Sequence, residues 1–147
     1  MRGRCRGIAH RLRFRLPSDT DAMDAALDVT FFVVHTCWIA FNCLGWIWRR
    51  TRPWQLATVS LTAISWFGLG LWFGWGYCPC TDWHWQVRER LGFSDPPSYI
   101  QLLVREVTGI LLSTNLANAL AVVTLIVTGL LGAVLTVRDR AVARRAS

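Results

Sequence analysis

Three long stretches without a charged residue constrain this chain more than any other feature. They cover residues 29–48, 54–77 and 116–137. A helix rises about 1.5 Å per residue, so some 20 residues cross the roughly 30 Å hydrocarbon core of a bilayer. The chain is also 53% hydrophobic and only 17% charged, which excludes a disordered protein and is unusual for a soluble domain. We predict an all-α membrane protein in which these stretches form a bundle of three transmembrane helices.

The connection between the second and third spans is predicted to hold one or two amphipathic helices, interfacial or re-entrant. The first covers residues 82–91, where apolar side chains recur at four-residue spacing on one face: Trp83, Val87 and Leu91. Gly92 is expected to end this helix, which would lie on the membrane with its apolar face down. The second covers residues 99–112 and contains two adjacent charges, which make it a poor span.

The arginines indicate how the chain is oriented in the membrane. All 16 basic residues are arginines, and they stand in short clusters beside the uncharged stretches, which is typical of topology determinants rather than of nucleic-acid binding. The loop 49–53 and the residues after 137 carry seven arginines, whereas residues 78–115 carry three. Because cytosolic loops carry the excess of positive charge, we expect a multi-pass protein of the bacterial inner membrane with a cytosolic C-terminus and an external Cys78–Asn115 connection.

Residues 1–22 form a basic N-terminal extension with six arginines in its first 16 positions. No apolar segment follows that would make it a secretory signal. It is interpreted as a cytosolic tail, an organelle presequence or the product of a mis-assigned start. We favour the last, with Met23 as the first residue, because the arginine count then agrees with the rest of the chain. Residues 23–147 are predicted to form a single polytopic membrane domain.

Two polar residues inside the first span are candidates for a buried site. His35 and Asn42 are seven residues apart and share a helix face, so they are expected to form a polar stripe toward the bundle interior. Ionisable groups in a bilayer are costly and are candidates for function, although a neutral histidine also serves as a hydrogen-bonding group between helices. Together with His84 they are the candidates for cofactor binding, including haem held between His35 and His84.

The densest group of reactive side chains follows the second span. Four residues that zinc accepts as ligands fall within seven positions: Cys78, Cys80, Asp82 and His84. The CxC spacing differs from the CxxC of zinc ribbons and thioredoxin-like sites. In the alternative interpretation, Pro79 stops the second helix and Thr81 or Asp82 caps the next one. We predict no cofactor and keep zinc and haem as alternatives.

Small residues at four-residue spacing mark two helix faces for close packing. In the second span these are Gly70 and Gly74, and in the third they are Gly129 and Ala133. The glycines of the second span also allow a helix that frays or kinks near its end. Both faces are expected to contact another membrane protein or a second copy of the chain.

Several short motifs carry a family resemblance. They are Phe41-Asn42, Gly45-Trp46, Ser65-Trp66, Tyr77-Cys78-Pro79, Thr81-Asp82-Trp83-His84-Trp85, Leu91-Gly92 and Ser98-Tyr99-Ile100. With these motifs, the stretch from His35 to Tyr99 resembles DUF2784, a family of small bacterial membrane proteins without an assigned activity. The resemblance implies a small polytopic inner-membrane protein that starts near Met23. Cys80 stands where the family shows leucine, and Gln55 where members often show histidine, so neither a CxC metal site nor a bis-histidine site through position 55 is implied.

The motifs of the common catalytic classes are absent from the sequence. Asp and Glu are also missing from the centres of the spans, so an ion-coupled carrier lacks its usual groups. The favoured prediction is a non-enzymatic membrane module or small subunit, whose partners are the lipid bilayer and another membrane protein or a second copy. One alternative is a metal- or thiol-dependent redox protein that uses Cys78, Cys80 and His84. The other is a lipid-binding or lipid-sensing protein that uses the tryptophan-rich surface helix.

Overall fold

The computed structural model describes residues 19–146, and these contain helices and short connections but no strand. The elements are α1 (Asp19–Leu44), α2 (Arg52–Ala63), the π-helix η1 (Ile64–Leu69), α3 (Gly70–Phe73), α4 (Pro79–Arg90), α5 (Tyr99–Thr108) and α6 (Thr114–Ala146). Three stretches of this region are long and apolar enough to cross a membrane: Asp19–Leu44, Arg52–Phe73 and Thr114–Arg145. The predicted all-α membrane class with three spans is therefore confirmed. The N-terminal extension lies outside the described residues up to residue 18, so the start at Met23 stays a prediction.

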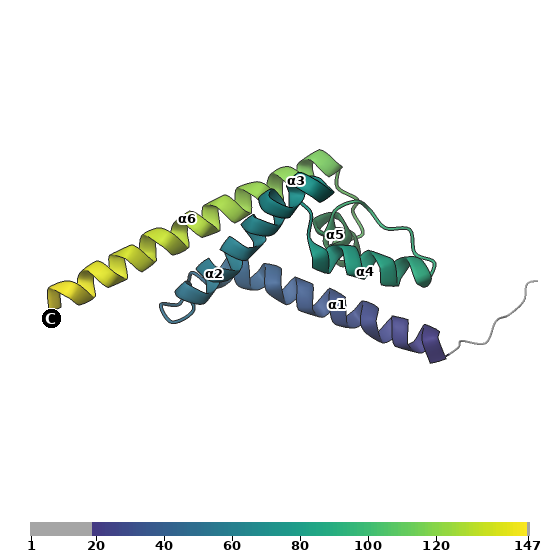
Figure 1. Cartoon of the computed structure of the whole chain (residues 1–147), viewed down its shortest axis with the longest axis horizontal. Coiled ribbons are helices and arrows are strands. Elements are labelled where there is room, and N and C mark those ends of the chain that lie inside the picture. The colour runs from purple at the N-terminus through teal and green to yellow at the C-terminus, as the bar shows by residue number, and fades with distance from the viewer. Residues whose placement is uncertain (1–18, 147) are drawn as a thin grey trace, which may run out of the picture.

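The helices form two packed groups that share α1. As Figure 1 shows, α2, η1 and α3 continue one another beside α6, and α4 lies along the N-terminal half of α1. The C-terminal half of α1 reaches the first group, where Asn42 contacts Thr58 and Thr62 of α2 and its side chain runs between the helices. The first half of α1 thus supports the connection between the second and third spans, and its second half belongs to the helix bundle.

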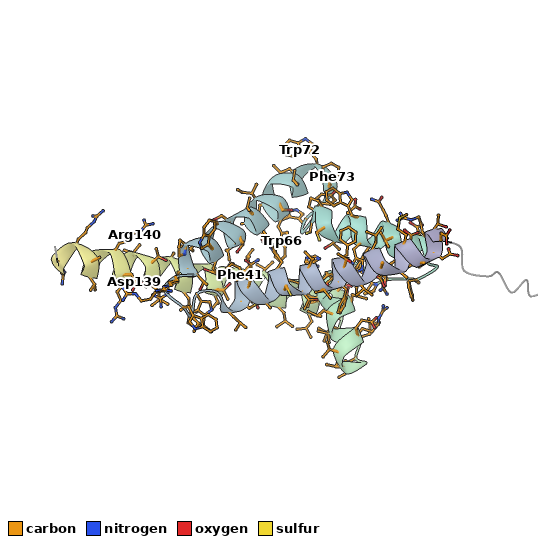
Figure 2. The ribbon with its side chains drawn as sticks, turned by 90° about the horizontal axis from the view of Figure 1, so that it is seen from below. Phe41, Trp66, Trp72, Phe73, Asp139 and Arg140 are labelled. Carbon is orange, nitrogen blue, oxygen red and sulfur yellow. The ribbon has the colours of Figure 1, made fainter. Side chains whose placement is uncertain are left out.

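The spans keep most of their apolar surface on the outside. Only 11% of the residues in the most apolar window of each span are buried within the chain. On α6, Leu130 and Val134 are more than half exposed. Figure 2 shows Trp72 and Phe73 projecting from the end of α3, whereas Phe41 and Trp66 lie between α1 and the second span. Such a surface is stable in a hydrocarbon environment, where it needs no cover from protein.

Inside the bundle, α1, α2 and α6 meet around one buried amide. Gln55 of α2 is fully buried and donates hydrogen bonds to the carbonyl oxygens of Asn42 (3.2 Å) and Thr128 (3.3 Å). A Cβ atom on Gly132 would lie 2.3 Å from its Oε1, and one on Gly45 would lie 2.9 Å from its Cβ. These two glycines therefore make room for a polar side chain that ties the three helices together.

The small residues predicted for packing serve different purposes. Gly129 faces α2, since a Cβ atom there would lie 3.1 Å from Val59 Cγ1, and Ala133 is half-buried. Gly74 has a φ of +101° and ends α3, so Gly70 and Gly74 do not share a continuous helix face. Gly70 is buried against the returning backbone of Trp75 and Gly76. The expected Gly70–Gly74 face for a partner helix is therefore wrong, because the chain turns at the second glycine.

The helix ends depart from the predicted boundaries for local reasons. α1 ends at Leu44 rather than at residue 48, and Gly45 begins the turn that follows. The carbonyl oxygen of Gly45 accepts a hydrogen bond from Thr51 Oγ1 at 2.6 Å. α4 begins at Pro79, the favoured residue for the first helical position, with Cys78 before it. Neither Thr81 nor Asp82 caps this helix, so that prediction is wrong. α5 ends at Thr108 because Gly109 has a φ of +74°, which is left-handed.

Candidate functional site: a charge cluster between α1 and α4

One face of α1 carries the acidic and aromatic groups that meet the connection. Asp24, Asp28 and His35 are separated by four and seven residues, so they point to the same side of the helix. α4 packs on this side and runs antiparallel to α1, since Arg90 pairs with Asp24 and His84 with Asp28. The local periodicity of two helices thus brings residues about 60 positions apart into contact.

At the centre of this face lies a cluster of five ionisable side chains, called here the α1–α4 charge cluster: Asp28, His84, Arg88, Asp95 and Arg105. His84 Nε2 lies 2.7 Å from Asp28 Oδ1, and Arg88 Nη1 donates to the same oxygen at 3.0 Å. Arg88 Nε donates to Asp95 Oδ2 at 2.7 Å, and Arg105 Nη2 lies 3.2 Å from Asp95 Oδ1. Each carboxylate therefore takes two nitrogen partners, and Arg88 joins them.

The cluster is largely removed from solvent. His84 is fully buried, and the side chains of Arg88 and Asp95 are 7% and 6% exposed. Burial alone would lower the pKa of Arg88, but its hydrogen bonds to Asp95 and Asp28 reverse this and raise that pKa above its usual range. Arg88 is therefore a permanent cation, and the two carboxylates that it bridges complement it. A buried charge group is tolerated only when it is paired in this way.

Tyr99, the first residue of α5, links the cluster to the histidine inside the first span. Its ring stacks on His35 with 3.9 Å between centroids, and it lies 6.1 Å from His84. Its hydroxyl donates to the carbonyl oxygen of Phe32 at 2.9 Å and lies 3.0 Å from Thr36 Oγ1. Burial raises the pKa of Tyr99, so this phenol stays protonated and keeps α5 attached to α1.

The predicted polar stripe of His35 and Asn42 is present, and the two residues contact different parts of the molecule. His35 and Asn42 are both buried. His35 lies against Tyr99, and Asn42 accepts a hydrogen bond from Thr58 in the helix bundle at 2.6 Å. The Nδ1 atoms of His35 and His84 are buried and have no hydrogen-bond partner among residues 19–146. Two imidazoles near one tyrosine thus each keep one unsatisfied nitrogen.

The four predicted metal ligands are not gathered at one point. His84 turns inward to Asp28, whereas Cys78 and Asp82 line a separate cavity of about 220 Å³ together with Tyr77 and Trp85. Within residues 19–146 no three His, Cys, Asp or Glu side chains come close enough to hold a metal ion. Burial, and next the neighbouring Cys78, raise the pKa of Cys80, which lowers its thiolate fraction and its reactivity at neutral pH.

The inward face of α4 differs from the predicted apolar face. Val87 was expected to face the membrane but is buried within the chain, where His84 and Arg88 lie beside it, whereas Trp83 is 58% exposed. The expectation of one apolar face turned to the membrane is therefore wrong for Val87, because α4 packs this side against α1, and the direction of Trp83 relative to a membrane stays a prediction. Gly92 does end the helix as predicted, with its N–H donating to Glu89 and that of Phe93 to Arg88.

Sequence reasoning missed five members of this region: Asp28, Arg88, Asp95, Tyr99 and Arg105. Asp28 directly precedes the first uncharged stretch and stands seven residues before His35 on the same face. Arg88 stands four residues after His84, which also places them on one face. These two spacings were the available signal, and they would have paired the polar face of α1 with that of α4.

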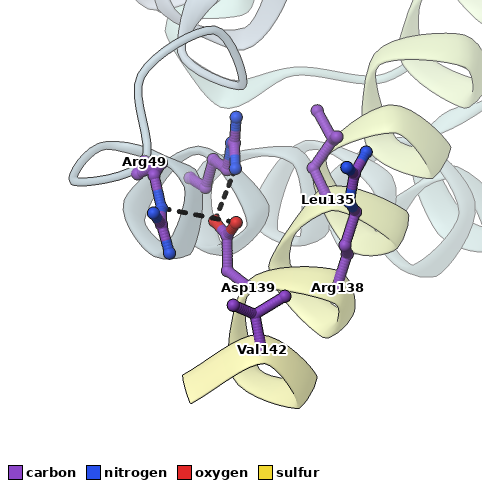
Figure 3. Close-up of a pocket in the computed structure, with 6 residues that line it drawn as sticks. Arg49, Leu135, Arg138, Asp139 and Val142 are labelled. Atoms are coloured by element: carbon purple, nitrogen blue, oxygen red, sulfur yellow. Dashed lines mark hydrogen bonds and ion pairs between the residues drawn. The ribbon is translucent and has the colours of Figure 1, made fainter. Parts of the chain in front are cut away.

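A second group of charges lies at the other end of the molecule, where α6 leaves the bundle. Asp139 pairs with Arg52 and with Arg49, the latter with 3.3 Å between Nε and Oδ1. Figure 3 shows Asp139 between Arg49 and Arg138, beside Leu135 and Val142. The turn at residues 45–51 and the end of α6 are joined by these contacts around a cavity of about 270 Å³.

Comparison with known proteins places the chain in a family but adds no activity. The family described as "Protein of Unknown function (DUF2784)" matches residues 25–137, which include the whole second span and most of the first and third spans but end just before Arg138 and Asp139. No curated protein and no solved structure matches the chain. The matched region includes the motifs between His35 and Tyr99 and all five residues that build the α1–α4 charge cluster. The chain therefore belongs to the DUF2784 family.

Proposed function

We propose that the protein is a non-enzymatic membrane module, a small subunit that presents a rigid α4–α5 platform to another membrane protein. The observation that carries this proposal is the closure of the α1–α4 charge cluster. In this cluster, two aspartates pair with two arginines and one histidine. None of these five residues lines either of the two cavities described above. A catalytic acid or base needs access to a substrate, whereas the His84 and Asp95 side chains are 0% and 6% exposed and that of Asp28 is 19% exposed.

The same closure argues for a platform that holds its shape. An amphipathic helix that only rests on a membrane needs an apolar face, and buried ion pairs would add desolvation costs without a benefit. Here α4 is fixed by charges on a transmembrane helix, so its outer residues keep one orientation. Trp83 projects from that outer face. Exposed tryptophans on rigid elements are frequent anchors of protein interfaces.

The small-residue faces of the spans, which the sequence indicates as the contact with a partner, are used within the chain or interrupted. Gly129 packs against Val59 within the chain, and Gly74 ends a helix. Large apolar side chains cover the outer face of α6, and such faces usually contact lipid, because close helix packing needs small residues. We therefore place the contact with a partner on the outer face of α4 rather than on the spans.

Site-specific photo-cross-linking in native membranes tests this proposal. A photoreactive amino acid at Trp83 is expected to give one discrete protein adduct, and the same probe at Val134 of α6 only lipid adducts. Val134 is the matched control, since it has a similar exposure, 64% against 58%. Monomer and lipid adducts from both positions would contradict the subunit proposal.

Lipid binding is the second candidate, and one observation favours it. Trp72 and Trp75, at the turn after the second span, are 77% and 80% exposed. Tryptophans at this level are typical of membrane interfaces, where their rings lie among lipid headgroups. Lipid adducts at Trp83 in the experiment above, with none to protein, would favour this candidate.

The alternative of a metal- or thiol-dependent redox protein is tested by measuring the bound metal and haem. Metal analysis and a visible absorption spectrum of the purified protein are expected to give less than one equivalent of metal and no haem band. A stoichiometric metal or a haem band would replace the module proposal by a metal- or thiol-dependent redox protein.

A further inference from the structure

We propose that the cavity between the 45–51 turn and α6 binds the phosphate group of an anionic membrane lipid. Six residues line this cavity of about 270 Å³: Arg49, Arg52, Leu135, Arg138, Asp139 and Val142. Three guanidinium groups and one carboxylate give the lining a net positive charge. An anion that enters the cavity therefore meets more cations than Asp139 neutralises.

The three arginines have different amounts of hydrogen-bonding capacity left. Each of the three guanidinium nitrogens of Arg52 donates a hydrogen bond within the chain: Nε to the carbonyl oxygen of Trp46 at 2.8 Å, Nη1 to Asp139 and Nη2 to the carbonyl oxygen of Ile47. Its side chain is only 12% exposed. Arg52 thus holds the turn against α6 and positions Asp139, and it is not expected to donate to a ligand.

Arg49 and Arg138 keep donors for a ligand. Arg49 contacts Asp139 through Nε alone, and its side chain is 67% exposed. The guanidinium of Arg138 has no ion pair or hydrogen bond within the described part of the chain, which includes residues 19–146. Figure 3 shows these two arginines on opposite sides of Asp139. A phosphate on the open side of the cavity, away from the Asp139 carboxylate, would accept hydrogen bonds from both arginines, and each guanidinium can bind phosphate oxygens in a bidentate manner.

The level of the cavity points to a lipid rather than to a soluble anion. Arg49 directly follows the uncharged stretch 29–48, and Arg138 directly follows the stretch 116–137. Both therefore stand where the hydrocarbon core ends and the lipid headgroups begin. Leu135 and Val142 lie one helical turn on either side and add apolar lining. A phosphodiester with its glycerol and acyl chains matches this combination of charge and apolar surface.

The test uses the full-length protein in detergent and native mass spectrometry, with phosphatidylglycerol as the anionic probe and phosphatidylcholine as the probe without net charge. We expect phosphatidylglycerol adducts, and an affinity about 30-fold lower in the double variant R49Q/R138Q, because an arginine near anionic lipid contributes a factor of about five. The matched control is R50Q/R140Q. It removes the same charge from neighbouring positions outside the cavity lining and is expected to stay within about twofold of the unmodified protein.

Three results would overturn the proposal. Equal losses in the two double variants would show attraction to the basic end in general, without a site. Equal binding of phosphatidylcholine would exclude recognition of the net negative charge. Displacement of the lipid by an equal concentration of inorganic phosphate would overturn the lipid assignment and indicate a soluble anion. Size-exclusion profiles and circular dichroism of both double variants verify that folding is unchanged, so that a lost adduct reports on the cavity.

Discussion

The α1–α4 charge cluster and the arginines around Asp139 differ in how far their charges are removed from water. In the cluster, the Asp95 and Arg88 side chains are almost completely buried, and each has two charged partners. Around Asp139, Arg52 donates to the carboxylate from a mostly buried position, Arg49 is two-thirds exposed, and Arg138 has no ion pair among residues 19–146. The same residue types thus serve two purposes. Closed and buried charges fix the fold, and open charges remain available to an anion.

The balance of charge differs between the two ends as well. Residues 19–28 and 78–115 hold eight acidic residues and three arginines, whereas residues 45–53 and 138–147 hold seven arginines and one aspartate. Figure 1 places these groups at opposite ends of the molecule. Because positive charge accumulates on the cytosolic side, we propose that the Asp139 end faces the cytosol and that α4 and α5 face outward. Reporter fusions after Ser147 and near Asp95 test this orientation.

The largest expected effect comes from opening the closed end. Arg88→Met leaves Asp95 and Asp28 without their shared cation, and the loss of one partner from a buried ion pair costs about 3–5 kcal/mol. The free energy of unfolding of the detergent-solubilised protein is the measurement. Arg90→Met is the matched control on the same helix, since its exposed side chain pairs with Asp24 at the edge of the cluster and should matter far less. Equal losses would mean that the cluster is not closed to water.

A smaller effect is expected from the helix bundle that joins the two ends. Gly132→Ala places a methyl group 2.3 Å from the Oε1 of Gln55, whose amide is held in place by two hydrogen bonds that Nε2 donates. Overpacking of this kind costs about 1–3 kcal/mol. Gly68→Ala is the control, because its added Cβ meets only Ile64 Cγ2 at 3.6 Å. If Gly132→Ala unfolds like the unmodified protein, Gln55 is free to move and does not tie the helices together.

At the open end, the loss of an ion pair is expected to cost little. Asp139→Asn removes the partner of Arg49 and Arg52, and a partly exposed pair is worth about 0–1 kcal/mol. High salt helps to distinguish the exposed ion pairs from the buried ones, since at about 1 M the screening length falls to roughly 3 Å. The Asp139→Asn effect on unfolding should then shrink by a larger fraction than the Arg88→Met effect, because Arg49 and Asp139 are more exposed than Arg88 and Asp95. An Asp139→Asn effect that salt leaves unchanged would show this end to be as closed as the other.

Much of the fold was predictable, because each span is a property of one contiguous stretch. The three uncharged runs, the end of α4 at Gly92 and the inward direction of His35 and Asn42 all follow from local composition and helical spacing. The turn at Gly74 shows the limit of a spacing motif. Its GxxxG pattern is correct for a helix face, but the positive φ of the second glycine ends the helix there.

The charge cluster was not predictable in the same way, because it depends on contacts between residues about 60 positions apart. Apolar periodicity groups Trp83 with Val87 on one face of α4 and assigns Arg88 to the polar side, whereas the structure buries Arg88 with Val87 and leaves Trp83 exposed. What decides the orientation of α4 is the pair of carboxylates on α1, which offset the cost of burying a guanidinium. Local patterns indicate which residues share a face, and only the packing partner determines whether that face is buried.

The smallest expected effect separates the cluster from the cysteines that precede it. Cys80→Leu replaces a half-buried thiol that lies outside the cluster. Leucine is the residue that the family shows at this position. We expect the free energy of unfolding to change by no more than about 0.5 kcal/mol, with unchanged metal content by elemental analysis. His84→Leu is the comparison on the same helix, because it removes the imidazole that contacts Asp28 at 2.7 Å and leaves part of a buried carboxylate unsatisfied. A Cys80 variant more damaging than the His84 variant would transfer the importance of this helix from its buried charges to its thiols.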